Sequence, residues 1–200
     1  MVLLDRASRF LWELQCGRKD RKLFRRAIRT LGRGVKTTHN LTLITEGERR
    51  YGQVLFEIGF EPLHTGKRGR PPKTLPNGVK VCLKNKGAQA HRRGRKRPRY
   101  QAPQPEHPQT SQSLENSPIH ANHLEAFNAS LRRRCAAYRR KTNTYAKKKQ
   151  RLQQRLDVYW IIHNFVRVHF TTRQVPAVAL GIIEQGLSLA QIFSISFIWN

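Results

Sequence analysis

The sequence predicts an α/β protein, and two observations support that prediction. Over residues 1–63, segments with strand patterns alternate with segments of helical periodicity, in the order strand, helix, strand, helix, strand. Residues 119–200 then add further segments of helical pattern. A chain of 200 residues is long enough for one core of ordinary size, or for a core with an appendage.

The first elements are predicted from local periodicity. Val2–Leu4 is a short apolar run, and apolar and polar residues alternate over Phe10–Cys16, which is typical of a half-buried strand. Asp5–Ser8 is expected to be the turn between the two strands. Asp20 is placed to cap a helix that ends at about Leu31, where two glycines follow.

A second strand-and-helix pair follows. Leu41–Thr45 is a short run rich in β-branched residues, and we expect it to be an interior strand. Apolar residues at helical spacing then predict a helix over residues 51–58, followed by a brief strand near Phe60–Leu63.

The composition changes at residue 65. Positions 67–99 hold thirteen Lys and Arg residues and no Asp or Glu, and residues 101–118 are rich in Pro, Gln and Ser. Such a segment buries too little apolar surface to offset its chain entropy, so most of it is expected to be flexible. One short strand is predicted inside it, where Val79, Val81 and Leu83 alternate with polar residues.

The charge of the chain indicates an anionic partner. Lys and Arg outnumber Asp and Glu by 39 to 12, which gives a formal net charge of +27. Nucleic acid is the leading partner for such a balance. No apolar run is long enough for a membrane span and no secretion signal is apparent, so we expect a cytoplasmic, nucleoid-associated protein without a membrane partner. The three cysteines are far apart and are interpreted as free thiols.

Two basic clusters are candidate DNA contacts. Arg68-Gly69-Arg70-Pro71, preceded by Lys67, resembles the core of the AT-hook, in which arginines enter a narrow A·T-rich minor groove. The alternative is a chance match in an arginine-rich linker. The second cluster is predicted to bind phosphates without sequence preference, and its cations include Arg92, Arg93, Arg95, Lys96 and Arg97.

A central helix is predicted over Ile119–Thr142. Glu125, Arg132 and Arg139 recur every seven residues along the border of its apolar stripe. A carboxylate followed by a row of cations suits a metal-assisted enzyme that acts on a phosphate backbone. The alternative is that Glu125 closes a capping turn begun by Asn122 and that the arginines are a solvated face. The stripe consists of Leu124, Phe127, Leu131, Cys135 and Tyr138.

Two more helices are predicted near the end of the chain. The first spans residues 147–170, begins exposed and ends buried, and the second begins near Pro176 and includes Ala177–Ile183. His163 is interpreted as a core histidine rather than as a metal ligand.

Three stretches together resemble bacterial insertion-sequence transposases of the DDE type, most closely the insertion-sequence-one group. They are TEGERRYG (Thr45–Gly52), HLEAFNASLRRR (His123–Arg134) and HNFVRVHFTTRQVPAVALGI (His163–Ile182). The resemblance implies an RNase H-like core, in which two aspartates and a glutamate hold two Mg²⁺ or Mn²⁺ ions that activate water or a DNA 3′-hydroxyl. Element ends and target DNA are the implied partners, and a homodimer is left open.

The resemblance assigns roles to individual residues. Glu125 matches the final glutamate of the family, and Arg132 matches a basic residue that contacts DNA. Glu46 stands where the family has its second aspartate, so Glu46 and Glu125 are the predicted catalytic and metal-binding residues. The resemblance implies that the first aspartate belongs to a strand upstream of Met1. Asp5 is a candidate substitute, but its setting resembles the turn after the family's second strand, which favours a turn residue.

The expectation is therefore an N-terminally truncated, catalytically impaired transposase. Its predicted parts are a partial RNase H-like core over residues 1–64, a basic insertion over 65–118 and the C-terminal helices of the core over 119–200. Two alternatives stay open: a non-catalytic basic DNA-binding protein or regulator derived from the element, and a protein that binds structured RNA.

Overall fold

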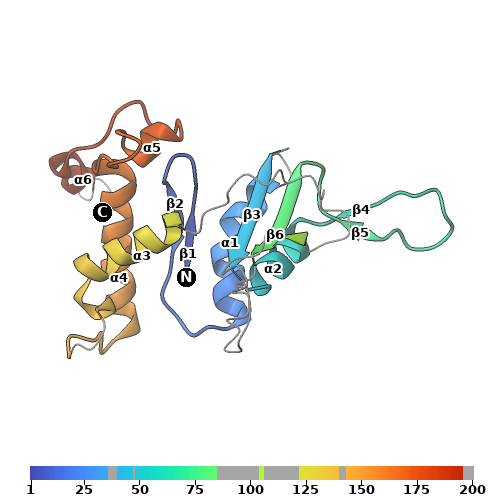
Figure 1. Ribbon diagram of the computed structural model, residues 1–200, viewed down its shortest axis with the longest axis horizontal. Coiled ribbons are helices and arrows are strands. Elements are labelled where there is room, and N and C mark those ends of the chain that lie inside the picture. The colour runs from blue at the N-terminus through green and yellow to red at the C-terminus, as the bar shows by residue number, and fades with distance from the viewer. Residues whose placement is uncertain (36–39, 47, 85–103, 106–121, 140–142, 196–200) are drawn as a thin grey trace, which may run out of the picture. The chain divides into compact units, whose positions relative to one another are not determined.

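The computed structural model describes residues 1–35, 40–46, 48–84, 104–105, 122–139 and 143–195. This part of the chain is a mixed α/β structure with small sheets and six α-helices (Figure 1). It divides into two compact units, each with its own internal contacts. Unit 1 comprises Met1–Arg18 and Asn122–Asn200, and unit 2 comprises Lys19–Ala121.

Unit 1 begins with an antiparallel hairpin. Strand β1 (Val2–Leu4) pairs with β2 (Leu11–Leu14), with an irregular register between Leu3 and Leu4. The turn between them is closed by Asp5, whose carboxylate accepts hydrogen bonds from the Ser8 backbone N–H at 2.7 Å and the Ser8 hydroxyl at 2.6 Å. Both predicted strands and the predicted turn are confirmed.

The second edge of β2 is covered by side chains rather than by a strand. Asn164 accepts from the Leu11 N–H at 2.8 Å and donates to the Leu11 carbonyl at 2.9 Å. In the same way Gln153 accepts from the Cys16 N–H at 2.9 Å and donates to the Leu14 carbonyl at 3.0 Å. These amides satisfy the backbone groups that an edge strand leaves unpaired.

The side chains that cover β2 come from one helical segment. It consists of α4 (Lys149–Ile161) and the π-helical turn η2 (Ile162–Val166), which follows it directly. The predicted helix over residues 147–170 therefore ends at Val166. Asn164 is buried, but Val158, Val168 and Phe170 are exposed, which contradicts the expectation of a buried second half.

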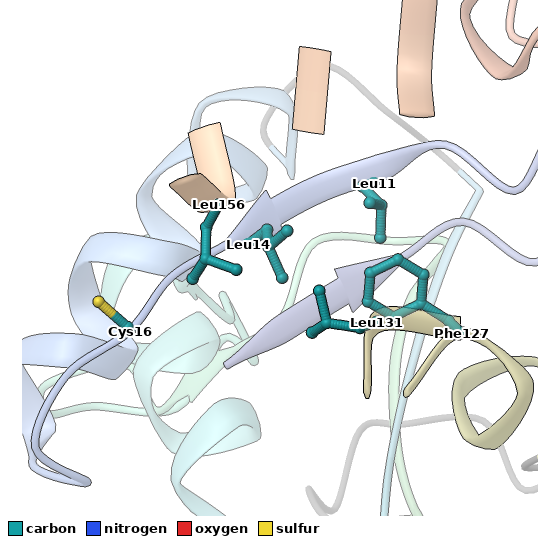
Figure 2. Packing of buried hydrophobic residues seen from close by; sticks show 6 residues of the cluster. All are labelled: Leu11, Leu14, Cys16, Phe127, Leu131 and Leu156. Carbon is teal, nitrogen blue, oxygen red and sulfur yellow. The ribbon is translucent and has the colours of Figure 1, made fainter. Parts of the chain in front are cut away.

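The core of unit 1 lies between this hairpin and two helices (Figure 2). Its buried residues are Leu11, Leu14 and Cys16 from the hairpin segment, Phe127 and Leu131 from α3 (Asn122–Arg134), and Leu156 from α4. The alternation in the sequence placed Trp12 on the buried side of the strand. Instead Leu11 is fully buried and Trp12 is half-buried, because the register shift changes which residues of the strand face the helices.

Helix α3 is shorter than the predicted 119–142. It ends at Arg134, and Cys135 has an extended backbone with φ −111° and ψ 107° before the 3-10 turn η1 (Ala136–Tyr138). Cys135 and Tyr138 still pack against the core, although they do so from beyond the helix. The start of the predicted helix, residues 119–121, lies outside the described residues.

Two short helices complete unit 1. Helix α5 (Pro176–Ala179) begins at the predicted proline but ends before Ile183, and α6 (Leu189–Ile195) follows it. None of the helices in the described residues combines the length and the apolar character that a membrane crossing requires.

Unit 2 begins with α1 (Arg21–Val35). Asp20 caps it as predicted, since its carboxylate accepts from the Leu23 N–H at 2.9 Å. The helix continues through Gly32 and Gly34 to Val35, so the predicted end near Leu31 is wrong. A glycine inside a helix costs only about 1 kcal/mol, which the packing of the buried apolar face of α1 offsets.

The main sheet of unit 2 has the order β3-β6-β7. Strand β3 (Leu41–Glu46) runs parallel to β6 (Val79–Lys84), and β7 (Gln104–Pro105) pairs antiparallel with β6. Helix α2 (Arg50–Gly59) lies in the connection between the two parallel strands and buries Val54 and Leu55. This arrangement is the crossover that parallel pairing requires.

The interior strand of this sheet is β6 and not β3. We expected β3 to be interior, but in the described sheet it pairs only with β6. Val79, Val81 and Cys82 are all buried, which is typical of a strand that is covered on both faces. The short strand predicted inside the basic segment is therefore confirmed, and it occupies the centre of the described sheet.

A second, smaller hairpin projects from unit 2 (Figure 1). Strands β4 (Glu61–Pro62) and β5 (Lys73–Thr74) pair antiparallel and carry a long exposed loop between them. The Leu63 N–H donates to the Pro72 carbonyl at 2.8 Å, which extends the pairing into the base of the loop.

Candidate nucleic-acid interface

Glu125 lies in the first turn of α3 and is exposed. A carboxylate at this position stabilises the helix by its interaction with the macrodipole, whether or not it has a further role. Arg132 lies seven residues later, on the last turn, and is exposed as well. Phe127 and Leu131 bury the opposite side of the helix, so the orientation of both charged residues is fixed.

The second predicted catalytic residue belongs to the other unit. Glu46 is the last residue of β3 in unit 2, whereas Glu125 is in unit 1, and the position of the Glu46 side chain lies outside the described part. Their convergence on a shared cation stays a prediction. Within the described residues, no three His, Cys, Asp or Glu side chains gather where they could hold a metal ion.

Glu48, close to Glu46 in sequence, has a structural role. Its two oxygens accept from the Arg50 guanidinium at 2.7 and 2.8 Å, and Lys19 lies 2.9 Å away. The hydrogen bonds from Arg50, and to a lesser extent the one from Lys19, together lower the pKa of Glu48 to about 2. Since Arg50 also donates to the Lys19 carbonyl at 2.9 Å, this network joins the start of α2 to the segment before α1.

Asp5 has a structural role too. Both hydrogen bonds from Ser8 end on the same oxygen of its carboxylate and close the β1–β2 turn. The interpretation of Asp5 as a turn residue is confirmed.

The cations of α1 fall into two groups, which differ in whether they form ion pairs. Arg21 and Arg25 form ion pairs with Glu57 of α2, so their charge is partly neutralised inside unit 2. Lys22, Arg26 and Arg29 are exposed, and in the described structure none of them forms an ion pair. This second group is available to an anionic partner.

The end of α3 gathers four arginines. Arg132, Arg133 and Arg134 are exposed in the last turn, where the carbonyl end of the helix favours cations. Arg139 lies beyond the helix, so the predicted row of charges at seven-residue spacing does not continue along α3. Its guanidinium donates instead to the Arg133 carbonyl at 3.5 Å, which brings the fourth cation back toward the helix end.

The AT-hook-like tetrapeptide lies in the loop between β4 and β5. Lys67, Arg68 and Arg70 are exposed there, and Gly69 has φ +117°, a conformation that residues with side chains rarely adopt. The base of the loop is held by Lys73, whose ammonium lies 3.9 Å from the centre of the Phe60 ring. The second basic cluster, Arg92, Arg93, Arg95, Lys96 and Arg97, lies outside the described residues.

The outer face of α4 is a candidate surface that the sequence analysis missed. Arg151, Gln154, Arg155 and Val158 line a shallow depression of about 400 Å³. The signal was present in the spacing, since these residues recur at i, i+3, i+4 and i+7 while Leu152 and Leu156 point to the core. This surface is not apparent from the sequence because residues 147–155 are mostly polar, which indicates only the exposed start of a helix.

His163 is a core histidine, as predicted. Its ring stacks on Tyr159 at 6.1 Å and meets Phe127 edge-on at 5.6 Å, and Nε2–H donates to the Arg9 carbonyl at 3.0 Å. Burial lowers the pKa of His163 below its ordinary value.

Comparison of the chain with protein-family models, with curated proteins and with solved structures finds no match.

Proposed function

We propose that this protein is a DNA-binding protein of the DDE transposase type, with an RNase H-like core that is catalytically impaired in the 200-residue chain. The observation that carries the proposal is the arrangement of α3. Exposed Glu125 and exposed Arg132 stand seven residues apart on a helix whose other side is anchored by Phe127 and Leu131. This is the carboxylate and cation pair that the resemblance requires.

The order of the elements supports the same proposal. A hairpin, a helix and a parallel β-α-β crossover precede the helix that carries Glu125. The backbone groups of Met1 and Asp5 form hydrogen bonds on the side of β1 that faces β2, so the backbone groups of Val2 and Leu4 face the other way. Among the described strands, β1 pairs only with β2. An added upstream strand with the first aspartate would find a free edge there.

The exposed cations support binding to DNA. Each Lys or Arg that neutralises a phosphate releases a counterion, so unpaired surface cations are a source of affinity, whereas cations already paired with carboxylates contribute less. In the part of the chain that the structure describes, exposed cations without an ion pair lie in the loop of the β4–β5 hairpin, at the end of α3 and on the outer faces of α1 and α4.

The catalytic part of the proposal is tested by cleavage of duplex DNA that carries element ends. The 200-residue protein is expected to give little or no Mg²⁺-dependent cleavage. A chain with an added upstream strand bearing an aspartate, together with Glu46→Asp, is expected to recover it, because the shorter side chain suits the strict geometry of Mg²⁺. Robust cleavage by the unextended chain would contradict the proposal.

The control for that experiment is Glu125→Ala in the extended chain. It is expected to abolish cleavage and to leave the affinity for DNA nearly unchanged, because Glu125 adds no phosphate contact. Equal cleavage with and without Glu125 would show that the resemblance assigned the wrong residue.

A non-catalytic DNA-binding protein or regulator is the second candidate. It is favoured by the structural roles of Asp5 and Glu48, which leave fewer carboxylates for chemistry. An extended chain that binds DNA with the same affinity but never cleaves it would select this candidate. Preference for structured RNA over duplex DNA in competition would select an RNA-binding protein instead.

A further inference from the structure

The outer face of α4 has a mixed composition that differs from a plain solvated helix face. Arg151, Gln154, Arg155 and Val158 share one side of the helix and are exposed. Val158 has 57% of its surface exposed, although it is apolar and lies beside two arginines. By contrast the exposed row on α1 consists of cations alone, at Lys22, Arg26 and Arg29.

The opposite side of α4 fixes this face in place. Leu156 is 1% exposed in the core, and Gln153 bonds to the backbone of β2. Asp157, the only acidic residue of α4, accepts a hydrogen bond from Gln153 at 2.8 Å. Among the described residues neither Arg151 nor Arg155 forms an ion pair, so both guanidiniums are available to a ligand.

The four side chains are of the types that read base pairs. Arginine bonds to guanine or to phosphate, glutamine bonds to the N6 and N7 of adenine, and small apolar groups contact the methyl of thymine. The major groove of B-DNA is about 12 Å wide and admits an α-helix of about 10–12 Å in diameter. Lys147, Lys148 and Lys149 lie at the start of the helix, where they can hold the flanking phosphates.

We infer that α4 is a recognition helix, which places Gln154 and Val158 against base edges in the major groove of duplex DNA and Arg151 and Arg155 against guanine or phosphate. The inference rests on the DNA-binding function proposed above and adds sequence preference to it.

The test is selection of binding sites from randomised duplex DNA, followed by affinity measurements on selected and unselected duplexes. The unaltered protein is expected to enrich a motif. Q154A/V158A is expected to lose roughly tenfold in discrimination while its affinity for unselected duplex stays within about threefold, because these side chains neutralise no phosphate. R151Q/R155Q is expected to reduce the slope of log affinity against log salt by about two.

The matched control is K22Q/R26Q, which removes two exposed cations from α1. It is expected to reduce the salt slope by a similar amount and to keep the motif, and circular dichroism and thermal unfolding check that every variant is folded. If the unaltered protein enriches no motif, or if Q154A/V158A still prefers the motif, the inference that α4 is a recognition helix is wrong and the DNA-binding proposal stands. If duplex DNA is not bound, and structured RNA or anionic vesicles are bound instead, both are wrong.

Discussion

At the scale of residues, one buried amide explains how unit 1 keeps a two-stranded hairpin stable. Asn164 is 0% exposed and bonds to both backbone groups of Leu11, as a neighbouring strand would. Its partner lies more than 150 positions away, so no local pattern could have predicted the contact. Asp5 and Asp20 were predictable because their partners lie three residues away in the sequence.

His163 gives a prediction at the same scale. Burial disfavours its charged form, and His169 and Arg134 lower its pKa further. The unfolded chain therefore binds the proton more readily, so stability is complete above the ordinary pKa of 6.5 and falls as the pH drops toward the lower folded-state pKa. One such proton contributes at most about 1.4 kcal/mol per pH unit.

The measurement is the free energy of unfolding in urea between about pH 7.5 and 5, a range around the ordinary histidine pKa. His163→Gln keeps a donor for the Arg9 carbonyl and is expected to flatten the loss of stability at acid pH. His169→Gln, in a less buried histidine whose pKa is also lowered, is the control and is expected to flatten it less. An unchanged pH profile in His163→Gln would contradict this account.

At the scale of elements, the sequence predicted the existence of helices and strands better than their ends. The starts of α1 and α5 follow from a capping aspartate and a proline, which act locally. The ends depend on packing: α1 continues past two glycines, and α3 stops at Arg134. The central position of β6 was missed because Val79 and Val81 lie in a basic segment whose composition suggested flexibility.

The cap of α1 gives the prediction for this scale. Asp20→Ala removes the acceptor of the Leu23 N–H and is expected to destabilise unit 2 by about 1 kcal/mol. Asp20→Asn keeps a side-chain oxygen and is expected to stay within a few tenths of a kcal/mol. Urea unfolding followed by circular dichroism measures both, and an equal loss in the two variants would show that the charge of Asp20, rather than the cap, stabilises the helix.

At the scale of the whole molecule, the positive charge of the chain is the basis of the proposed DNA binding. The net charge of +27 indicated an anionic partner, but it did not show which cations are available. The structure separates them, because Arg21 and Arg25 pair with Glu57 while Arg132 and Arg133 are exposed at the end of α3. Glu46 and Glu125 belong to different units, so their convergence on one site stays a prediction.

The most direct test of this account is the salt dependence of binding to duplex DNA. We expect a slope of log affinity against log salt of about −6 or steeper. R132Q/R133Q is expected to reduce the magnitude of this slope by about two. R21Q/R25Q is expected to reduce it by less, because Glu57 already neutralises part of the charge of Arg21 and Arg25. An affinity that hardly changes between about 50 and 200 mM salt, or an equal effect of the two variants, would contradict DNA binding through unpaired surface cations.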